Sequence, residues 1–358
     1  MPINVALGHV SNDFMIAALL LYSLAVLAFA GDFAFGRPRR ATAVAAQPAR
    51  VYATVGAVAG ADAAAPGSAP GVPGSAPVEA GSSAGAAYKM PELQVPALRA
   101  IMQAGAWVRA GMLLSTLAVL SHATAVTTRG FAVHRAPWGN MYEFVTALTC
   151  FAAIFFLGVM IRYRAWALGV FVMGSVVVIL GLAETLIYTA AGQLVPALQS
   201  YWLSIHVTAM TISTGIFFVS TVLGVVYLCV DRYNQRVAAG KAEPGNGIVE
   251  RLPSMEQLDR LAYRTIVFGF PIWTFGVMAG AIWADQAWGR YWGWDPVETW
   301  AFITWVIYAA FLHARATAGW RGRRAHYIQL LGFASLAFNI LVVQVFFAGL
   351  HSYAGVAG

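Results

Sequence analysis

The chain has 358 residues, of which 59% are hydrophobic and only 10% are charged. A soluble domain carries about 25% charged residues, so this composition excludes a water-soluble globular protein and predicts an integral membrane protein. The formal net charge of +7 would also suit a nucleic-acid partner. The basic residues, however, concentrate in the loops on one side of the predicted spans, which indicates membrane topology instead.

Runs of about 20 apolar residues predict an all-α polytopic membrane protein of about eight transmembrane helices. If the N-terminus lies outside, the outer loops hold only Arg129, Arg135 and Arg290, and the other loops hold most of the Lys and Arg. This asymmetry predicts an N-out and C-out orientation. The approximate spans are 14–35, 107–126, 141–161, 165–188, 203–230, 263–284, 299–317 and 327–350.

A low-complexity segment separates the first span from the other seven. Residues 41–88 are almost all Ala, Gly, Pro, Ser and Val, without helical or strand periodicity, so no packed core is expected there. The sequence thus predicts an N-terminal transmembrane anchor (1–40), a cytoplasmic linker (41–106) and a seven-helix body (107–358). The first span is interpreted as an anchor rather than a cleaved signal peptide, because arginines follow it and none precedes it.

Three further residues of the body are interpreted as structural. In the polar loop 234–262, Ser254 precedes apolar and acidic positions, which predicts a short amphipathic helix leading into the sixth span. Cys150 and Cys229 fall inside predicted spans and form no C-x-x-C pair. We therefore interpret both cysteines as small buried residues without a redox role.

The loop between the sixth and seventh spans is unusually rich in tryptophan. The stretch 283–300, WADQAWGRYWGWDPVETW, contains five Trp residues spaced by Gly. Interfacial anchors need no such glycines, whereas glycines let a backbone pass close beneath a planar ligand. Asp295-Pro296 is expected to cap the seventh helix. We therefore predict a rigid aromatic shelf, with candidate binding residues Trp288, Gly289, Tyr291, Trp292, Gly293, Trp294, Asp295, Pro296 and Trp300.

Two histidines from different helices flank this loop on the predicted outer side. His206 lies at the outer end of the fifth span, and His351 lies just beyond the eighth. A flat metal-centred ligand on an aromatic surface needs two axial imidazoles, and bis-histidine ligation is an ordinary way to hold haem. His206 and His351 are therefore candidate iron ligands.

The other histidines are less informative. His313 lies inside the seventh span, where an ionisable group is costly and is a functional hypothesis by default; the alternative is a neutral ring that donates to a helix carbonyl. No role is assigned to His122 or His134. His9 and His326 lie near polar boundaries and are expected to be solvated.

The segment 288–300, WGRYWGWDPVETW, resembles the WWD signature of the haem-handling membrane proteins of cytochrome c maturation, and above all the CcsA/ResC type of System II. The segment 137–144, PWGNMYEF, and the histidine segments YWLSIHV, FLHAR and GLHSYAG are similar to further segments of that family. The resemblance covers residues 137–355. Val297 departs from the family, in which Lys often follows Asp-Pro, so no cation is assigned to that position.

The resemblance implies that His206 and His351 ligate haem b over the WWD loop. It also implies that His313 ligates haem on its way outward, together with an imidazole from a CcsB/ResB-type partner. The implied function is haem transport and presentation within a holocytochrome c synthase of the bacterial cytoplasmic membrane, with the platform on the periplasmic face. The implied substrate is an apocytochrome c with a C-x-x-C-H segment, kept reduced indirectly by a thioredoxin-like protein. No catalytic residue is expected, because the reacting thiols belong to the apocytochrome.

Two other function classes compete with this interpretation. A b-type cytochrome subunit passing electrons to quinone places paired histidines across a bundle, but a basic turn separates His313 from His326, and electron transfer does not require the WWD order. A transporter of lipid-linked or amphipathic solutes could use an aromatic gate without haem. Quinol-dependent haem reduction without apocytochrome would favour the first alternative, and full activity without haem would favour the second.

Overall fold

The computed structural model describes residues 3–36, 96–192, 200–243 and 248–351. Within these ranges the chain is helical, without strands, and eight helices are long and apolar enough to cross a membrane. The predicted all-α polytopic architecture is confirmed. The low-complexity segment 41–88 lies outside the described residues, so its interpretation as a disordered linker stays a prediction.

The helices match the predicted spans and mostly extend beyond them. The first helix begins at Val5 rather than near residue 14, and α6 is the longest, with 38 residues. The spans are α1 (Val5–Phe35), α3 (Ala106–Val133), α4 (Met141–Tyr163), η1 with α5 (Trp166–Leu186), α6 (Tyr201–Ala238), α8 (Met255–Trp288), α9 (Pro296–Thr317) and α10 (Arg323–Phe338) continued by η3 (Asn339–Val343) and α11 (Gln344–Phe346). The remaining described helices are the short α2 (Ala97–Gln103) and α7 (Ile248–Arg251).

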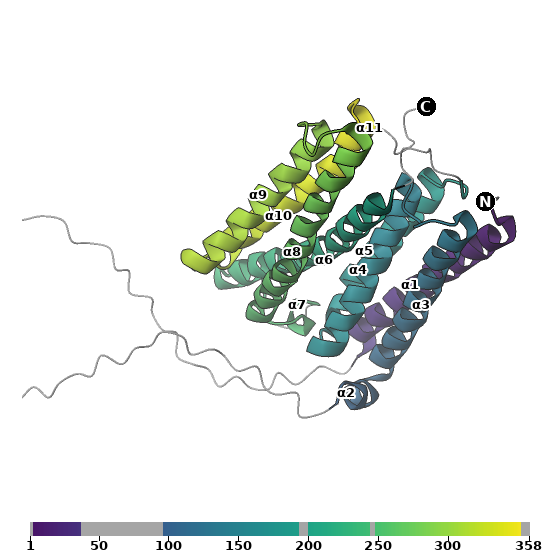
Figure 1. Ribbon diagram of the computed structural model, residues 1–358. Coiled ribbons are helices and arrows are strands. Elements are labelled where there is room, and N and C mark those ends of the chain that lie inside the picture. The colour runs from purple at the N-terminus through teal and green to yellow at the C-terminus, as the bar shows by residue number, and fades with distance from the viewer. Residues whose placement is uncertain (1–2, 37–95, 193–199, 244–247, 352–358) are drawn as a thin grey trace, which may run out of the picture. The chain divides into compact units, whose positions relative to one another are not determined.

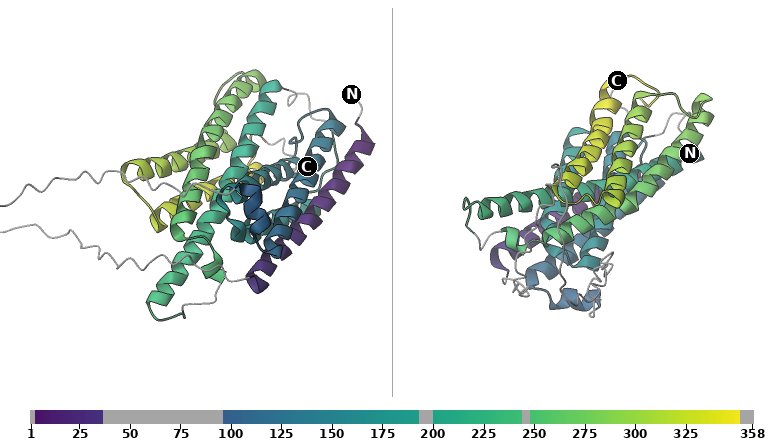
Figure 2. Two further views of the ribbon diagram at one scale, coloured as in Figure 1. Left: turned by 90° about the horizontal axis from the view of Figure 1, so that it is seen from below. Right: turned by 90° about the vertical axis from the view of Figure 1, so that its left-hand side faces the viewer.

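The helices pack around two apolar cores. In one core, α1 packs along α3 and α5, and large side chains such as Phe29 and Phe156 are fully buried. In the other, α6, α8, α9 and α10 bury Phe217, Trp273 and Tyr308. The long α6 contacts α4 as well as α8, so it joins the two cores (Figure 1). Figure 2 shows the helices from two further sides.

The helix termini follow from capping residues. Ser254 caps α8 through a capping box with Gln257, so the helix predicted in the preceding loop is the first part of α8 itself. Asp295 caps α9, Pro296 occupies its first position, and Glu298 completes the capping box. The predicted cap at Asp295 is confirmed and fixes where the Trp-rich loop ends, whereas the short helix predicted after Ser254 is continuous with the sixth span.

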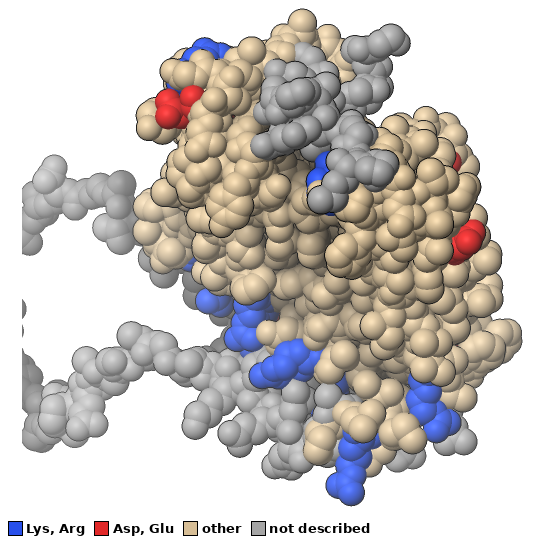
Figure 3. Space-filling view, turned by 45° about the vertical axis from the view of Figure 1, so that its right-hand side comes forward, with Lys and Arg blue, Asp and Glu red and all other residues tan. Residues whose placement is uncertain are grey.

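The two ends of the bundle differ in charge. The described N-terminus and the end of α11 lie at one end, which we call the cavity end, whereas α2 and α7 lie at the other (Figure 1). Lys and Arg side chains gather at the end opposite the cavity end in Figure 3. Cytoplasmic loops carry such an excess, which supports the predicted orientation without testing it. Arg129, expected in a loop, is buried in the last turns of α3.

Two expectations about individual side chains were wrong. Cys150 is buried, but Cys229 is exposed on the surface of α6. His326 is 2% exposed rather than solvated, and its ring centroid lies 4.0 Å from that of Tyr227. Its Nδ1 lies 2.7 Å from Gln329 Oε1, so polar contacts inside the bundle replace the expected water.

Candidate functional site

A cavity of about 680 Å³ opens at the end of the bundle where α11 ends, and this end takes its name from the cavity. The α3–α4 loop, the start of α6, the end of α8, the Trp-rich loop and the turn after α11 surround it. This volume falls within the range of small-molecule and cofactor sites, which are typically apolar with a few placed polar groups. Its aromatic lining comprises Trp138, Phe144, Tyr201, Trp273, Trp283, Trp288, Tyr291 and Trp292.

His206 lines this cavity from the second turn of α6. Its Nδ1 lies 2.7 Å from the carbonyl oxygen of Gly276 on α8. A carbonyl only accepts, so Nδ1–H donates, and Nε2 of the neutral ring keeps its lone pair. The ring also lies against Gly280, where a Cβ would approach its Cε1 and Nδ1 to 2.6 Å. Gly276 and Gly280 are one helical turn apart and let α6 pack closely on α8.

His351 lines the same cavity from the turn that follows α11. Its Nδ1 lies 2.9 Å from Asp295 Oδ1, so here too Nδ1–H donates and Nε2 keeps its lone pair. The ring is in edge-to-face contact with Trp288 and Trp283, with centroid distances of 5.1 and 6.1 Å. The structure therefore brings together the two histidines that the sequence singled out.

Asp295 connects the start of α9 with the C-terminal turn. Its carboxylate accepts N–H groups from Val297 at 3.0 Å and from Leu350 at 2.7 Å, in addition to His351. Burial acts to raise the pKa of this carboxyl, but the hydrogen bonds from His351, Leu350 and Val297 hold the pKa below its usual value. Asp295 is therefore an ionised acceptor shared by the start of α9 and the C-terminal turn.

The candidate residues of the Trp-rich loop divide into those that line the cavity and those that shape the loop. Trp288, Tyr291 and Trp292 line the cavity. Gly289 ends α8 with a φ of +70°, a conformation that favours glycine. The N–H of Gly293 donates to Glu298 Oε2 at 2.9 Å.

The remaining candidates lie away from the cavity lining. Trp294 is 65% exposed, and its ring makes an edge contact with that of Trp292. Trp300 packs on Phe338 with a centroid distance of 4.4 Å. Pro296 occupies the first position of α9. The loop thus presents part of its aromatic surface to the cavity and uses the rest for packing.

His313 and His122 lie outside the cavity lining. His313 is exposed on α9, near the end opposite the cavity end, and no contact of its ring is found among the described residues. His122 is fully buried in α3, with Nδ1 3.4 Å from the Tyr22 hydroxyl. His134 ends α3 in a left-handed conformation and does line the cavity.

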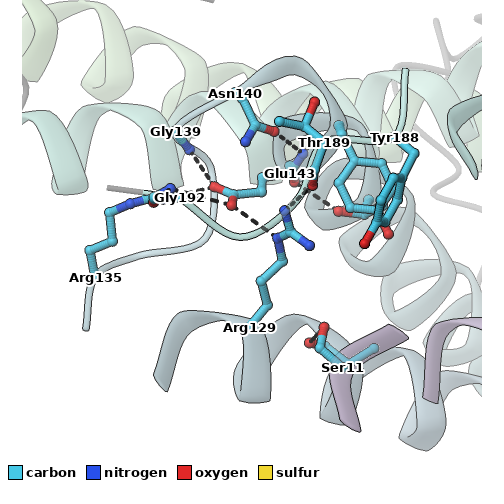
Figure 4. Close-up of polar contacts among 12 residues, drawn as sticks. Ser11, Arg129, Arg135, Gly139, Asn140, Glu143, Tyr188, Thr189 and Gly192 are labelled. Atoms are coloured by element: carbon cyan, nitrogen blue, oxygen red, sulfur yellow. Dashed lines mark hydrogen bonds and ion pairs between the residues drawn. The ribbon is translucent and has the colours of Figure 1, made fainter. Parts of the chain in front are cut away.

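Sequence reasoning missed one wall of the cavity, the α3–α4 loop, whose Arg135, Trp138 and Asn140 line it. Figure 4 shows the fully buried Glu143 holding this loop. Its carboxylate accepts from Arg129 Nε at 2.9 Å, Arg135 Nη1 at 2.7 Å and the Gly139 N–H at 2.8 Å. The similarity of the segment 137–144 to the haem-handling family was the available signal for this wall.

Several buried polar atoms of the lining have no hydrogen-bond partner within the described chain. They are Nε of Arg135, Nε1 of Trp138, Trp273 and Trp283, and Oδ1 of Asn339. Buried polar atoms are rarely left unpaired in native proteins. Four of these five are N–H donors, so the cavity suits a ligand that is largely apolar but carries acceptor groups such as carboxylates. With the two free Nε2 atoms, these features fit haem.

Comparisons with known proteins show the family of this chain. A family model described as Cytochrome C assembly protein matches residues 138–351, from Trp138 of the α3–α4 loop to His351. The cytochrome c biogenesis protein CcsA of Guillardia theta is 35% identical over 254 residues, covering 66% of this chain and 83% of the relative. CcsA of Gloeobacter violaceus is 35% identical over 294 residues, covering 68% of this chain and 86% of the relative.

A solved structure has a similar fold. The match to cytochrome c haem lyase CcmF has a TM-score of 0.57 and 15% sequence identity, and it covers 95% of this chain. The chain spans only 47% of that structure. At this identity the likeness shows a similar fold and nothing beyond it.

Proposed function

The chain belongs to the cytochrome c assembly protein family, and from this premise we propose that it acts in cytochrome c biogenesis by holding haem for attachment to apocytochrome c. The observation that carries the proposal is the pair of imidazoles from separate helices that line one aromatic cavity. Each has its Nδ1 engaged by an acceptor, which leaves its Nε2 free to bind iron.

Haem b is the proposed cargo, with His206 and His351 as its two axial ligands. Trp288 and Trp292 would contact the porphyrin, and the unpaired indole N–H groups of the lining would meet the propionate carboxylates. Because the lining is aromatic and half-buried, it would also limit escape and oxidation of the haem. The chain is a multi-pass membrane protein, and we place the cavity on the outer face of a bacterial cytoplasmic membrane.

The proposed reaction needs no nucleophile from this chain. The histidine of the apocytochrome C-x-x-C-H segment replaces one axial imidazole, which brings both thiols near the haem vinyl groups. Each S–H then adds across one vinyl double bond, so that a C–S bond forms at one carbon and the thiol hydrogen ends on the other. The addition is redox-neutral, and the protein contributes positioning.

His313 is proposed to ligate haem before it reaches the cavity. Its ring is exposed on α9, so an imidazole from a second membrane protein could bind the opposite face of the haem. A partner of the CcsB/ResB type would supply that imidazole. Such a surface position is costly for an ionisable group in lipid, which supports a function for His313.

The absorption spectrum of the purified full chain tests the proposal. We expect a low-spin bis-histidine haem in the wild type and loss of haem and of cytochrome c formation in His206→Ala and His351→Ala. Added imidazole should partly restore both by filling the emptied coordination position. His9→Ala is the matched control, because His9 is exposed on α1 and outside the cavity. Unchanged haem content and spectra in both cavity variants would refute the proposal.

A further inference from the structure

The two proposed haem ligands are held by chemically different groups. The ring of His206 donates to a neutral backbone carbonyl, that of Gly276. The ring of His351 donates to the carboxylate of Asp295. Hydrogen bonds to ionised acceptors are roughly twice as strong as neutral ones, so the two imidazoles differ in how firmly their orientation and protonation are fixed.

Asp295 also fixes the backbone that carries His351. α11 ends at Phe346, and the Phe347 N–H still donates to the Val343 carbonyl at 3.1 Å. Asp295 Oδ2 accepts the Leu350 N–H at 2.7 Å. A methyl group on Gly349 would lie 2.5 Å from the same oxygen, so glycine allows this close approach. One carboxylate therefore sets both the position of the turn and the direction of the ring.

The same carboxylate is anchored on its own side. Asp295 is 6% exposed, its Oδ1 accepts the Val297 N–H, and its own N–H donates to Glu298 Oε2 at 3.1 Å. A carboxylate that accepts from the second nitrogen of a metal-bound histidine raises the basicity of that ligand and is a recurrent way to tune a metal. The arrangement places such a carboxylate beside one proposed ligand and a carbonyl beside the other.

We propose that Asp295 is a positioning residue that makes His351 the stronger axial ligand, and that His206 is consequently the ligand which the apocytochrome histidine replaces. The inference rests on the proposed function, because it presupposes that both histidines bind haem iron. It goes further in assigning unequal roles to the two ligands and a role to the carboxylate.

A double-mutant cycle separates this role from a general effect on the loop. Asp295→Asn is combined with His206→Ala and with His351→Ala in the full-length protein, because Asn remains a good N-cap. With His351 as the remaining protein ligand, Asp295→Asn should speed haem loss by about tenfold or more. With His351 already removed, the same substitution should add little. Equal effects in both backgrounds would overturn the inference.

Two spectroscopic readings distinguish an electronic effect from a structural one. Asp295→Asn should shift the haem midpoint potential in the positive direction, because a less basic imidazole stabilises ferric iron less. After CO photolysis of the reduced wild type, the transient haem keeps one histidine. If that histidine is His351, Asp295→Asn lowers the iron–histidine stretching frequency. An unchanged frequency would mean that His206 is retained, which contradicts the proposal.

Glu298→Gln is the matched control for loosening of the loop. It weakens the other half of the same capping box, where Glu298 accepts from Gly293 and Asp295. Glu298 has no hydrogen bond with His351 among the contacts of the described residues. If Glu298→Gln reproduces the frequency shift, loop loosening explains the effect and the inference fails.

If neither His206→Ala nor His351→Ala alters haem binding, the proposed function fails instead of the inference about Asp295.

Discussion

His206 and His351 line the same cavity, but different forces hold them. His206 lies between two long packed helices, where Gly280 makes room for its ring and the Gly276 carbonyl accepts its Nδ1–H. His351 lies on a turn after the last helix and is held by the buried carboxylate of Asp295. The first histidine is therefore fixed mainly by shape, and the second mainly by charge.

This difference predicts which changes each histidine tolerates. An added methyl group displaces a ring that is fixed by close packing, because the tightly packed neighbouring side chains cannot move to make room. A ring held by a carboxylate is sensitive instead to replacement of that carboxylate by an uncharged group of the same shape. A substitution that affects both histidines alike acts on what they share, whereas substitutions that affect only one of them separate packing from charge.

The largest effect is expected for Glu143→Gln, which acts on a cavity wall that both histidines share. Glu143 is fully buried and pairs with Arg129 and Arg135. Removing its charge leaves two guanidinium groups without their common partner, which should cost about 3 kcal/mol or more of unfolding free energy. Denaturant titration in detergent measures this, and haem should be lost from wild-type and single-histidine backgrounds alike.

Glu256→Gln is the control for that substitution. Glu256 pairs with Arg260 at the start of α8, where its side chain is 69% exposed. Surface pairs contribute about 0–1 kcal/mol, so stability should change little. Similar losses of unfolding free energy in the two Glu→Gln variants would show that the buried ion pairs of Glu143 are no more stabilising than an exposed pair.

Gly280→Ala should affect His206 and leave His351 in place. The new Cβ would lie 2.6 Å from the His206 ring, so the ring must rotate away from the Gly276 carbonyl. Overpacking of this kind costs about 1–3 kcal/mol, and haem retention should fall nearly as far as in His206→Ala. Gly174→Ala is the control, because no atom lies within 4 Å of a Cβ at Gly174 on α5. Normal haem retention in Gly280→Ala would show that the ring position is not set by packing.

Trp288→Ala should affect His351 and leave His206 in place. The Trp288 ring is in edge contact with those of His351 and Trp283. Such aromatic pairs contribute about 0.5–1.5 kcal/mol, so haem affinity should fall by a few-fold. Trp320→Ala, in the α9–α10 loop outside the cavity lining, is the control. Because Trp288 is also proposed to contact the porphyrin, part of its effect should remain in a His351→Ala background, but an effect that is equally large there would contradict the assignment of Trp288 to that histidine.

Much of the architecture could be predicted because it depends on local patterns. The apolar runs located all eight spans, and the Asp295-Pro296 pair located the start of α9. The predicted side of the membrane and the Trp-rich loop between them grouped His206 with His351 as candidates. These inferences need only the length of a helix, the chemistry of a cap and the alternation of loops across a membrane.

The supporting contacts could not be predicted, because they join residues far apart in the chain. His206 and the Gly276 carbonyl are separated by 70 positions, and His351 and Asp295 by 56. The same limitation explains why the prediction for His326 was wrong. Its position near a polar boundary suggested contact with solvent. Gln329, one turn away, and Asp259 on α8 contact its ring nitrogens inside the bundle. No local pattern indicates which distant acceptor a histidine will meet.

The smallest effect on either histidine site is expected for His313→Ala. His313 lies near the opposite end of α9 and is exposed, so haem added to the purified protein should bind the cavity with unchanged affinity and spectrum. In cells, where haem must arrive through the membrane, the same variant should carry less haem in the cavity and form less cytochrome c. Thr299→Ala on the same helix is the control, because within the described part of the chain its hydroxyl donates a hydrogen bond to the Trp294 carbonyl alone. Normal loading of His313→Ala in cells would remove the inner step and leave the two cavity histidines as the whole of the haem-binding site.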